Sequence, residues 1–115
     1  HLTWLSLDKT GLSEEGIANL NRLGELEVCS LAKCGITDKN INKLARMKVK
    51  KLNLSKNNFS DSGLLQLASN KDLEFLTLAE CYGVTRKGIA QFKKLNSVCR
   101  ISTDPLSTTG KDLGI

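Results

Sequence analysis

The sequence predicts an α/β fold in which similar coils, each with one strand and one short helix, stack side by side. Three observations predict it. An apolar pattern that begins at Leu2 returns at Leu26, Val49, Leu73 and, more weakly, Val98. The successive starts are 24, 23, 24 and 25 residues apart, a period typical of stacked arrays and not of a domain with one central core. Each strand pattern before the last is followed by a helical one.

The strand part of each coil reads as apolar residues at its first, fourth and sixth positions, as in Leu2, Leu5 and Leu7. Side chains alternate along a strand, so the fourth and sixth positions face inward and the third, fifth and seventh face the opposite side. The predicted coils span 2–25, 26–48, 49–72 and 73–97. A degenerate final coil over 98–115 carries Pro105, which cannot extend a strand ladder, and we expect it to act as a terminal cap.

The helical part of each coil begins after a hydroxyl residue whose oxygen can accept a hydrogen bond from a free backbone amide. Four residues fit this N-cap role: Ser13, Thr37, Ser60 and Thr85. Apolar residues spaced three and four apart then define the inward faces of four short helices. They are Ile17, Leu20 and Leu23; Ile41, Leu44 and Met47; Leu64, Leu67 and Ala68; and Ile89, Phe92 and Leu95. Parallel strands with right-handed crossovers follow.

The ninth position of each coil, in the turn after the strand, holds Thr10, Cys34, Asn57 or Cys81. We expect these side chains to point inward, where a polar one must satisfy backbone groups of the turn. Cys34 and Cys81 lie two coils apart, about 10 Å at the spacing of neighbouring strands, beyond the ~7 Å limit for a disulfide. All four cysteines are therefore interpreted as reduced, which favours the cytoplasm or another reducing compartment.

With its repeated strand pattern and turns such as Cys34-Gly35-Ile36-Thr37-Asp38, the chain resembles the leucine-rich repeat family, in its ribonuclease-inhibitor-like and cysteine-containing types. The resemblance implies a right-handed solenoid with parallel strands on the concave face, short helices on the convex face, and protein binding on the concave face. Small, lysine-rich and asparagine-rich arrays of this kind resemble effectors of intracellular bacterial pathogens, which implies secretion into a host cytosol. They also resemble substrate receptors of ubiquitin ligases, and the motifs leave both open.

Catalysis is not expected from these residues. The single histidine is His1, so a histidine base inside the fold for a Ser or Cys nucleophile is missing. The cysteines lack the spacing of a zinc site, and no glycine-rich phosphate loop is present. No apolar run approaches the roughly 18 residues of a membrane span. We expect no enzyme activity, no cofactor and no small-molecule substrate. Because the chain begins at His1, we also expect it to be a piece of a longer protein.

The outward strand positions predict a binding surface. The third-position column is large, with Trp4, Val28, Lys51, Phe75 and Arg100, whereas the fifth and seventh are mostly small and polar. An exposed Trp or Phe is not needed for folding and is typical of interface anchors. Lysines fill the eighth position of three coils. The predicted partner-binding residues are Trp4, Ser6, Asp8, Lys9, Lys33, Lys51, Asn53, Lys56, Phe75, Thr77, Glu80 and Arg100.

We therefore expect a non-enzymatic module that seats a folded protein, for example an enzyme that it inhibits, on its strand face. One alternative is a substrate-recognition segment of a larger enzyme or ubiquitin ligase. Nucleic acid binding through the lysines would suit the net charge of +5, but aromatic residues make up only 4% and no recognition signature is present. Two structural interpretations also stay open, in which Trp4 only shields the first strand and the lysines form a solvated rim.

Overall fold

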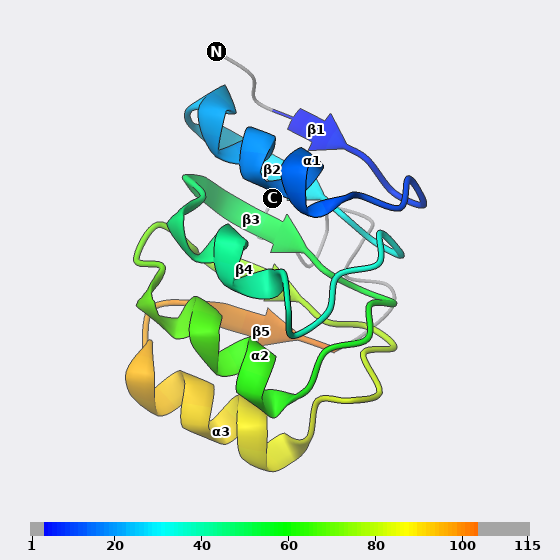
Figure 1. Ribbon diagram of the computed structural model, residues 1–115. Coiled ribbons are helices and arrows are strands. Elements are labelled where there is room, and N and C mark those ends of the chain that lie inside the picture. Colours follow the sequence, from blue (N-terminus) through cyan, green and yellow to red (C-terminus); the bar gives the residue numbers. More distant parts are fainter. Residues whose placement is uncertain (1–3, 104–115) are drawn as a thin grey trace.

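The computed structural model describes residues 4–103 and contains one five-stranded, all-parallel sheet. Each strand pairs with the strand that follows it in the sequence, so the order along the sheet is also the chain order (Figure 1). The strands are β1 (Trp4–Ser6), β2 (Leu26–Ser30), β3 (Val49–Asn53), β4 (Phe75–Thr77) and β5 (Arg100–Ser102). The predicted class, an α/β fold with parallel strands, is confirmed.

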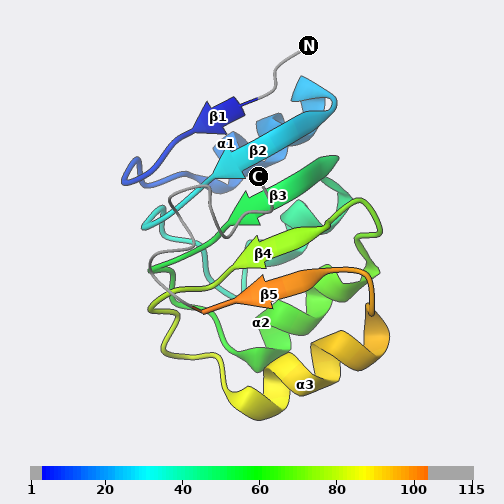
Figure 2. The ribbon, with the colours of Figure 1, turned by 180° about the vertical axis from the view of Figure 1, so that it is seen from behind.

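Short helices connect the strands. They are α1 (Glu14–Leu20), the 3-10 helices η1 (Asn21–Leu23) and η2 (Ile41–Arg46), α2 (Asp61–Gln66), the 3-10 helix η3 (Leu67–Ser69), and α3 (Arg86–Leu95). Figures 1 and 2 show all of them on one face of the sheet, and Figure 2 looks onto the opposite, strand face. The core lies between the two layers. The predicted cap over 98–115 lies mostly outside the described residues.

One buried asparagine ties two neighbouring coils together. The side-chain oxygen of Asn57 accepts hydrogen bonds from the backbone N–H groups of Cys34 and Ile36, both at 3.0 Å. At 2.9, 3.0 and 3.3 Å, its nitrogen donates to the carbonyl oxygens of Leu31, Leu54 and Ser55. Asn57 thus satisfies five backbone groups in the turns, as expected for a polar residue at this position.

The other ninth-position residues behave less uniformly. The buried thiols of Cys34 and Cys81 each donate to a carbonyl of the preceding coil, at 2.8 Å to Leu7 and 3.1 Å to Leu54. Thr10, expected to point inward, is exposed, and its hydroxyl donates to the carbonyl of Leu7 within its own coil at 2.6 Å. Across the stack, the neighbour of the Thr10 hydroxyl is the Cys34 sulfur of the following coil, 3.8 Å away, in place of a carbonyl of a preceding coil.

The helix starts follow the predicted capping pattern in two coils. Ser13 and Thr85 each accept a hydrogen bond from the N–H of the residue three positions later, Gly16 at 3.1 Å and Gly88 at 3.2 Å. Ser60 precedes α2 as predicted, but its hydroxyl donates to the Asp38 carboxylate at 2.7 Å and makes no capping bond. The capping role predicted for the Ser60 side chain is therefore wrong.

The second predicted helix is also wrong in its start and type. A 3-10 helix begins only at Ile41; Thr37 forms a parallel bridge with Asn58, and a turn over 38–40 separates it from the helix. Asn40 stands where the other coils have glycine. Its side-chain oxygen accepts from the Thr37 N–H at 2.8 Å, and the Thr37 hydroxyl accepts from the Lys39 N–H at 3.3 Å, so side-chain hydrogen bonds organise a separate turn before the helix.

Aspartates link the start of one helix to the coil before it. The Asp38 carboxylate accepts from the N–H of Ser60 at 2.9 Å as well as from its hydroxyl. Likewise, the Asp61 carboxylate accepts from the N–H of Thr85 at 2.7 Å and from the Thr85 hydroxyl. Negative charge is favourable at a helix N-terminus. Each aspartate therefore joins two coils and also stabilises the start of the helix in the next coil.

Candidate functional site

The third-position residues form one continuous row across the sheet. The parallel register pairs Trp4 with Val28, Val28 with Lys51, Lys51 with Phe75 and Phe75 with Arg100. We call these five residues the outer row. Their strand neighbours in the sequence, among them Cys29, Leu52 and Leu76, belong to the buried core under the helices. Alternation along a strand then puts the outer row on the strand face.

The outer row combines exposed and half-buried side chains. Trp4 is 56% exposed and Arg100 is also exposed, whereas Lys51 and Phe75 are half-buried and Val28 is buried. A hollow of about 180 Å³ opens at the Trp4 end of the row. It is lined by Trp4, Ser6, Asp8, Val28, Ser30, Lys51 and Asn53. Aromatic, aliphatic and cationic groups therefore surround one recess.

A second, polar row runs beside the first and consists of Ser6, Ser30, Asn53, Thr77 and Ser102. Two of its members, Ser30 and Asn53, bond to each other, and Ser30 also bonds to Asp8. One carboxylate oxygen of Asp8 accepts from the Ser30 hydroxyl at 2.7 Å and from the Ala32 N–H at 2.8 Å. The Asn53 side chain donates to the Ser30 hydroxyl at 3.1 Å. This network holds β1, β2 and β3 in register.

The expectation that Asn53 and Thr77 face solvent is wrong. Asn53 is 6% exposed and Thr77 is 0% exposed, so neither offers contact area to a partner. The Asn53 side-chain nitrogen donates to the Ser30 hydroxyl, and its side-chain oxygen accepts from the Ser55 N–H at 3.0 Å. The Thr77 hydroxyl is buried without a hydrogen-bond partner among the described residues, an arrangement that costs free energy.

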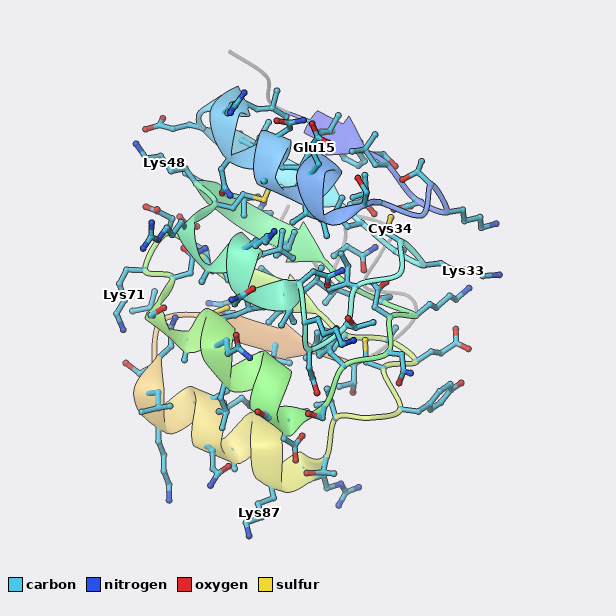
Figure 3. The ribbon with its side chains drawn as sticks, viewed as in Figure 1. Glu15, Lys33, Cys34, Lys48, Lys71 and Lys87 are labelled. Atoms are coloured by element: carbon cyan, nitrogen blue, oxygen red, sulfur yellow. The ribbon has the colours of Figure 1, made fainter. Side chains whose placement is uncertain are left out.

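The eighth-position residues Lys9, Lys33, Lys56 and Glu80, here called the turn column, follow the ends of four strands. All four are exposed and have a positive φ, of 63°, 53°, 61° and 57°. In Figure 3, Lys33 points away from the body at the edge opposite Lys48 and Lys71. Lys56 lies 3.7 Å from the Glu80 carboxylate, so the column ends in an ion pair.

Sequence reasoning missed Tyr82. It is 85% exposed, and its hydroxyl donates to Glu80 at 3.1 Å. This hydrogen bond, together with the charge of Glu80, raises the pKa of the Tyr82 hydroxyl. The sequence does contain a signal for this exposure. Between Cys81 and Val84 the fourth coil has one residue more than the other coils have at the same place, and a residue inserted in a turn projects from the stack.

The thiols are poorly suited to nucleophilic chemistry. Burial raises the pKa of Cys29 from 9.0 to about 12, with smaller contributions from Cys34 and Asp8, and it raises the pKa of Cys99 to about 11. Burial also raises the pKa of Cys81. Within residues 4–103, no group of three or more His, Cys, Asp or Glu side chains is placed to hold a metal ion. In the same range, no helix is long and apolar enough to cross a membrane.

Among the solved structures that share this fold are the following two. One is the tropomodulin C-terminal domain from Caenorhabditis elegans, with 15% identity, a TM-score of 0.67, and coverage of 97% of this chain and 79% of the other. The second is described as leiomodin-1 actin-binding site 2, with 17% identity, a TM-score of 0.69, and coverage of 96% and 78%. At these identities the likeness shows the fold alone. No family model and no curated protein sequence matches this chain.

These neighbours correct the family assignment made from the sequence. The chain was expected to belong with ribonuclease-inhibitor-like, cysteine-containing leucine-rich repeats and with effectors of bacterial pathogens, whereas these two structures are domains of tropomodulin and leiomodin. The assignment is wrong because a strand period near 24 residues specifies how coils stack and not which family they serve. A small buried residue such as Cys34 fits the same turn in any such coil.

Proposed function

We propose that this chain is a non-enzymatic protein-binding domain that seats a folded protein partner on its strand face. The observation that carries the proposal is the outer row. Five strands place Trp4, Val28, Lys51, Phe75 and Arg100 side by side in register. Tryptophan, phenylalanine and arginine at one exposed surface are typical of residues that anchor protein interfaces.

The arrangement of the row supports this role. Trp4 contributes a large exposed apolar area, and folding alone does not require that area to face solvent. Lys51 and Arg100 flank Phe75 on neighbouring strands, so each can pair with acidic groups around an apolar contact. We do not propose Asn53 and Thr77 as contacts, because they are buried. The accessible residues among the predicted contacts on the strands are Trp4, Ser6, Lys51, Phe75 and Arg100.

Actin is the partner that we propose to test first, in place of the enzyme expected from the sequence. The support is the fold likeness to a structure described as an actin-binding site of leiomodin-1. The four buried, unpaired thiols fit a reducing compartment, where such a partner would be met.

We also propose that the successive coils form a right-handed solenoid. Two observations support it: paired outer-row residues Val28, Lys51 and Phe75 are 23 and 24 positions apart, and Asn57 bonds to the turns of two coils. The coil limits at 26–48, 49–72 and 73–97 follow this spacing. A solenoid would present the strand face as one continuous surface.

The experiment measures the affinity of labelled monomeric actin for purified variants of the chain. Trp4→Ala combined with Phe75→Ala should weaken binding by about tenfold or more, because hot-spot aromatics carry much of the binding free energy. Lys51→Glu should weaken it further. Tyr82→Ala is the matched control, since Tyr82 is an exposed aromatic outside the row, and it should leave the affinity unchanged.

Two results would count against the proposal. If actin binds but the double variant keeps its affinity and its fold, the outer row is not the contact surface. If the wild-type chain does not bind actin at all, actin is not the partner.

A further inference from the structure

The turn column has an unusual backbone for its residue types. Lys9, Lys33, Lys56 and Glu80 lie at φ values between 53° and 63°, a left-handed conformation that glycine adopts freely and other residues adopt at a cost of about 1 kcal/mol or more each. Glycine would relieve that cost in each of the four coils. Three successive coils carry lysine at this position instead.

The column also brings like charges together. The N–H of Lys9 donates to the Ala32 carbonyl at 2.9 Å, and the N–H of Lys33 donates to the Ser55 carbonyl at 3.0 Å. These bonds join neighbouring coils, so the lysines repeat at about the strand spacing of ~4.8 Å. Ammonium groups anchored this close repel each other, and neither the backbone conformation nor the packing explains why both are cationic.

The carboxylates near the column form an ion pair with only one of its three lysines within the described residues. Lys56 pairs with Glu80 at 3.7 Å. Asp8 lies beside the column, but one of its oxygens already accepts from Ser30 and Ala32. Within the described residues, Lys9 and Lys33 have no ion pair. Asp8 keeps its negative charge, so Lys9, Lys33 and Asp8 together leave that end of the column net positive, whereas the Lys56–Glu80 end is close to neutral.

A hollow of about 220 Å³ lies along the column. Its small-residue floor includes Ala32, Ser55 and Ala79, and its edge is formed by the charged residues of the column. At ~30 Å³ for each water molecule, the hollow has the volume of about seven waters, enough for a few small or acidic side chains of an extended peptide. The described lining contains no aromatic ring on which a nucleotide base could stack.

We propose that the turn column docks an acidic, extended segment of the protein partner, with carboxylates over Lys9 and Lys33. This inference rests on the proposed protein-binding function and adds the chemistry of the partner. Alternate side chains of an extended segment lie about 6.6 Å apart, within reach of two flexible lysines. Because the Glu80 end is close to neutral and the Lys9 end is net positive, the acidic part of the segment lies toward Lys9.

The test uses a fluorescein-labelled peptide, Glu-Ala-Glu-Ala-Glu-Ala-Glu, and measures its binding to the chain by fluorescence anisotropy at low salt. The variant Lys9→Glu combined with Lys33→Glu should weaken binding by about tenfold, and added salt should weaken wild-type binding. The matched control, Lys48→Glu combined with Lys87→Glu, changes net charge equally at other places, as Figure 3 shows, and should bind within about twofold of wild type.

Three outcomes would overturn the inference. They are equal losses in the two double variants, equal binding of the peptide with Gln in place of Glu, and tighter lysine-dependent binding of an oligothymidine. Failure of the proposed function can be recognised separately. The variant with Trp4→Ala and Phe75→Ala should bind the peptide normally, because the outer row does not line this hollow.

Discussion

Gly16 and Gly88 occupy the same position in two coils, three residues after a hydroxyl N-cap, yet their replacement by alanine should change stability in opposite directions. A Cβ at Gly16 would meet only the Leu12 side chain at 3.4 Å and the Ser13 hydroxyl at 3.5 Å, which are ordinary contacts. A Cβ at Gly88 would overlap the carboxylate of Asp61, whose Cβ lies 2.8 Å away.

The expected magnitudes follow from these contacts. Alanine in place of glycine inside a helix stabilises by up to about 1 kcal/mol, so Gly16→Ala should raise the free energy of unfolding by about that amount. Gly88→Ala gains the same helical preference but displaces the Asp61 carboxylate from the N–H and hydroxyl of Thr85. Hydrogen bonds to a charged group contribute about 1.5–3 kcal/mol each, less at an exposed site, so we expect a net loss of about 1–3 kcal/mol.

Urea unfolding followed by far-ultraviolet circular dichroism measures both changes. The variant Asp61→Gly supplies a further check, because once the whole side chain is removed, including the Cβ at 2.8 Å, adding Gly88→Ala should become stabilising. A Gly88→Ala protein as stable as wild type would refute the assignment of Asp61 as the link between α2 and α3.

Four further predictions concern buried polar groups. Asn57→Ala should lower the free energy of unfolding by about 3–5 kcal/mol in urea titrations, since it leaves two backbone N–H groups unsatisfied, whereas the exposed Asn58→Ala should change it by less than about 0.5 kcal/mol. Thr77→Val should raise the midpoint of thermal unfolding, because it removes a buried hydroxyl without a described partner; a lower midpoint would show that the hydroxyl is bonded. With the pKa of Cys29 raised to about 12 and that of Cys99 to about 11, both thiols should resist alkylation in the folded chain at pH 8, and rapid labelling would contradict this. The same raised pKa values imply stability that is present below pH 9 and is lost as the pH rises toward 12, measurable in urea titrations across that range.

The rows of the strand face could be predicted from the sequence because the coil period fixes the register. Once the strand of each coil begins at an equivalent residue, Trp4, Val28, Lys51 and Phe75 must pair, and they do. The N-cap roles of Ser13 and Thr85 were predictable for a similar reason, since a hydroxyl residue acts on its own helix over three residues.

Features that depend on a neighbouring coil were not predictable from one coil's pattern. Ser60 has a local sequence context similar to that of Ser13, but its hydroxyl donates to Asp38, which is 22 residues away in the chain and outside the pattern of its own coil. The burial of Asn53 and Thr77 depends in the same way on what surrounds them in three dimensions, which the alternation of a single strand does not contain.

Two predicted inward leucines show a limit of the spacing rule. Leu23 is 41% exposed and Leu95 is 60% exposed. Each is the third residue of a set spaced by three, beginning at Ile17 and Ile89. Every step of three residues falls about 60° short of a full helical turn, so the third member has rotated about 120° away from the first.

The most direct test of the proposed binding face is photo-crosslinking to actin. A benzophenone amino acid would replace Phe75 on the outer row, Tyr82 in the projecting turn, or Lys87 on α3, in three otherwise identical proteins. The proposal predicts a strong crosslink from position 75 and little from the other two positions. Crosslinking from Lys87 or Tyr82 without any from position 75 would contradict it.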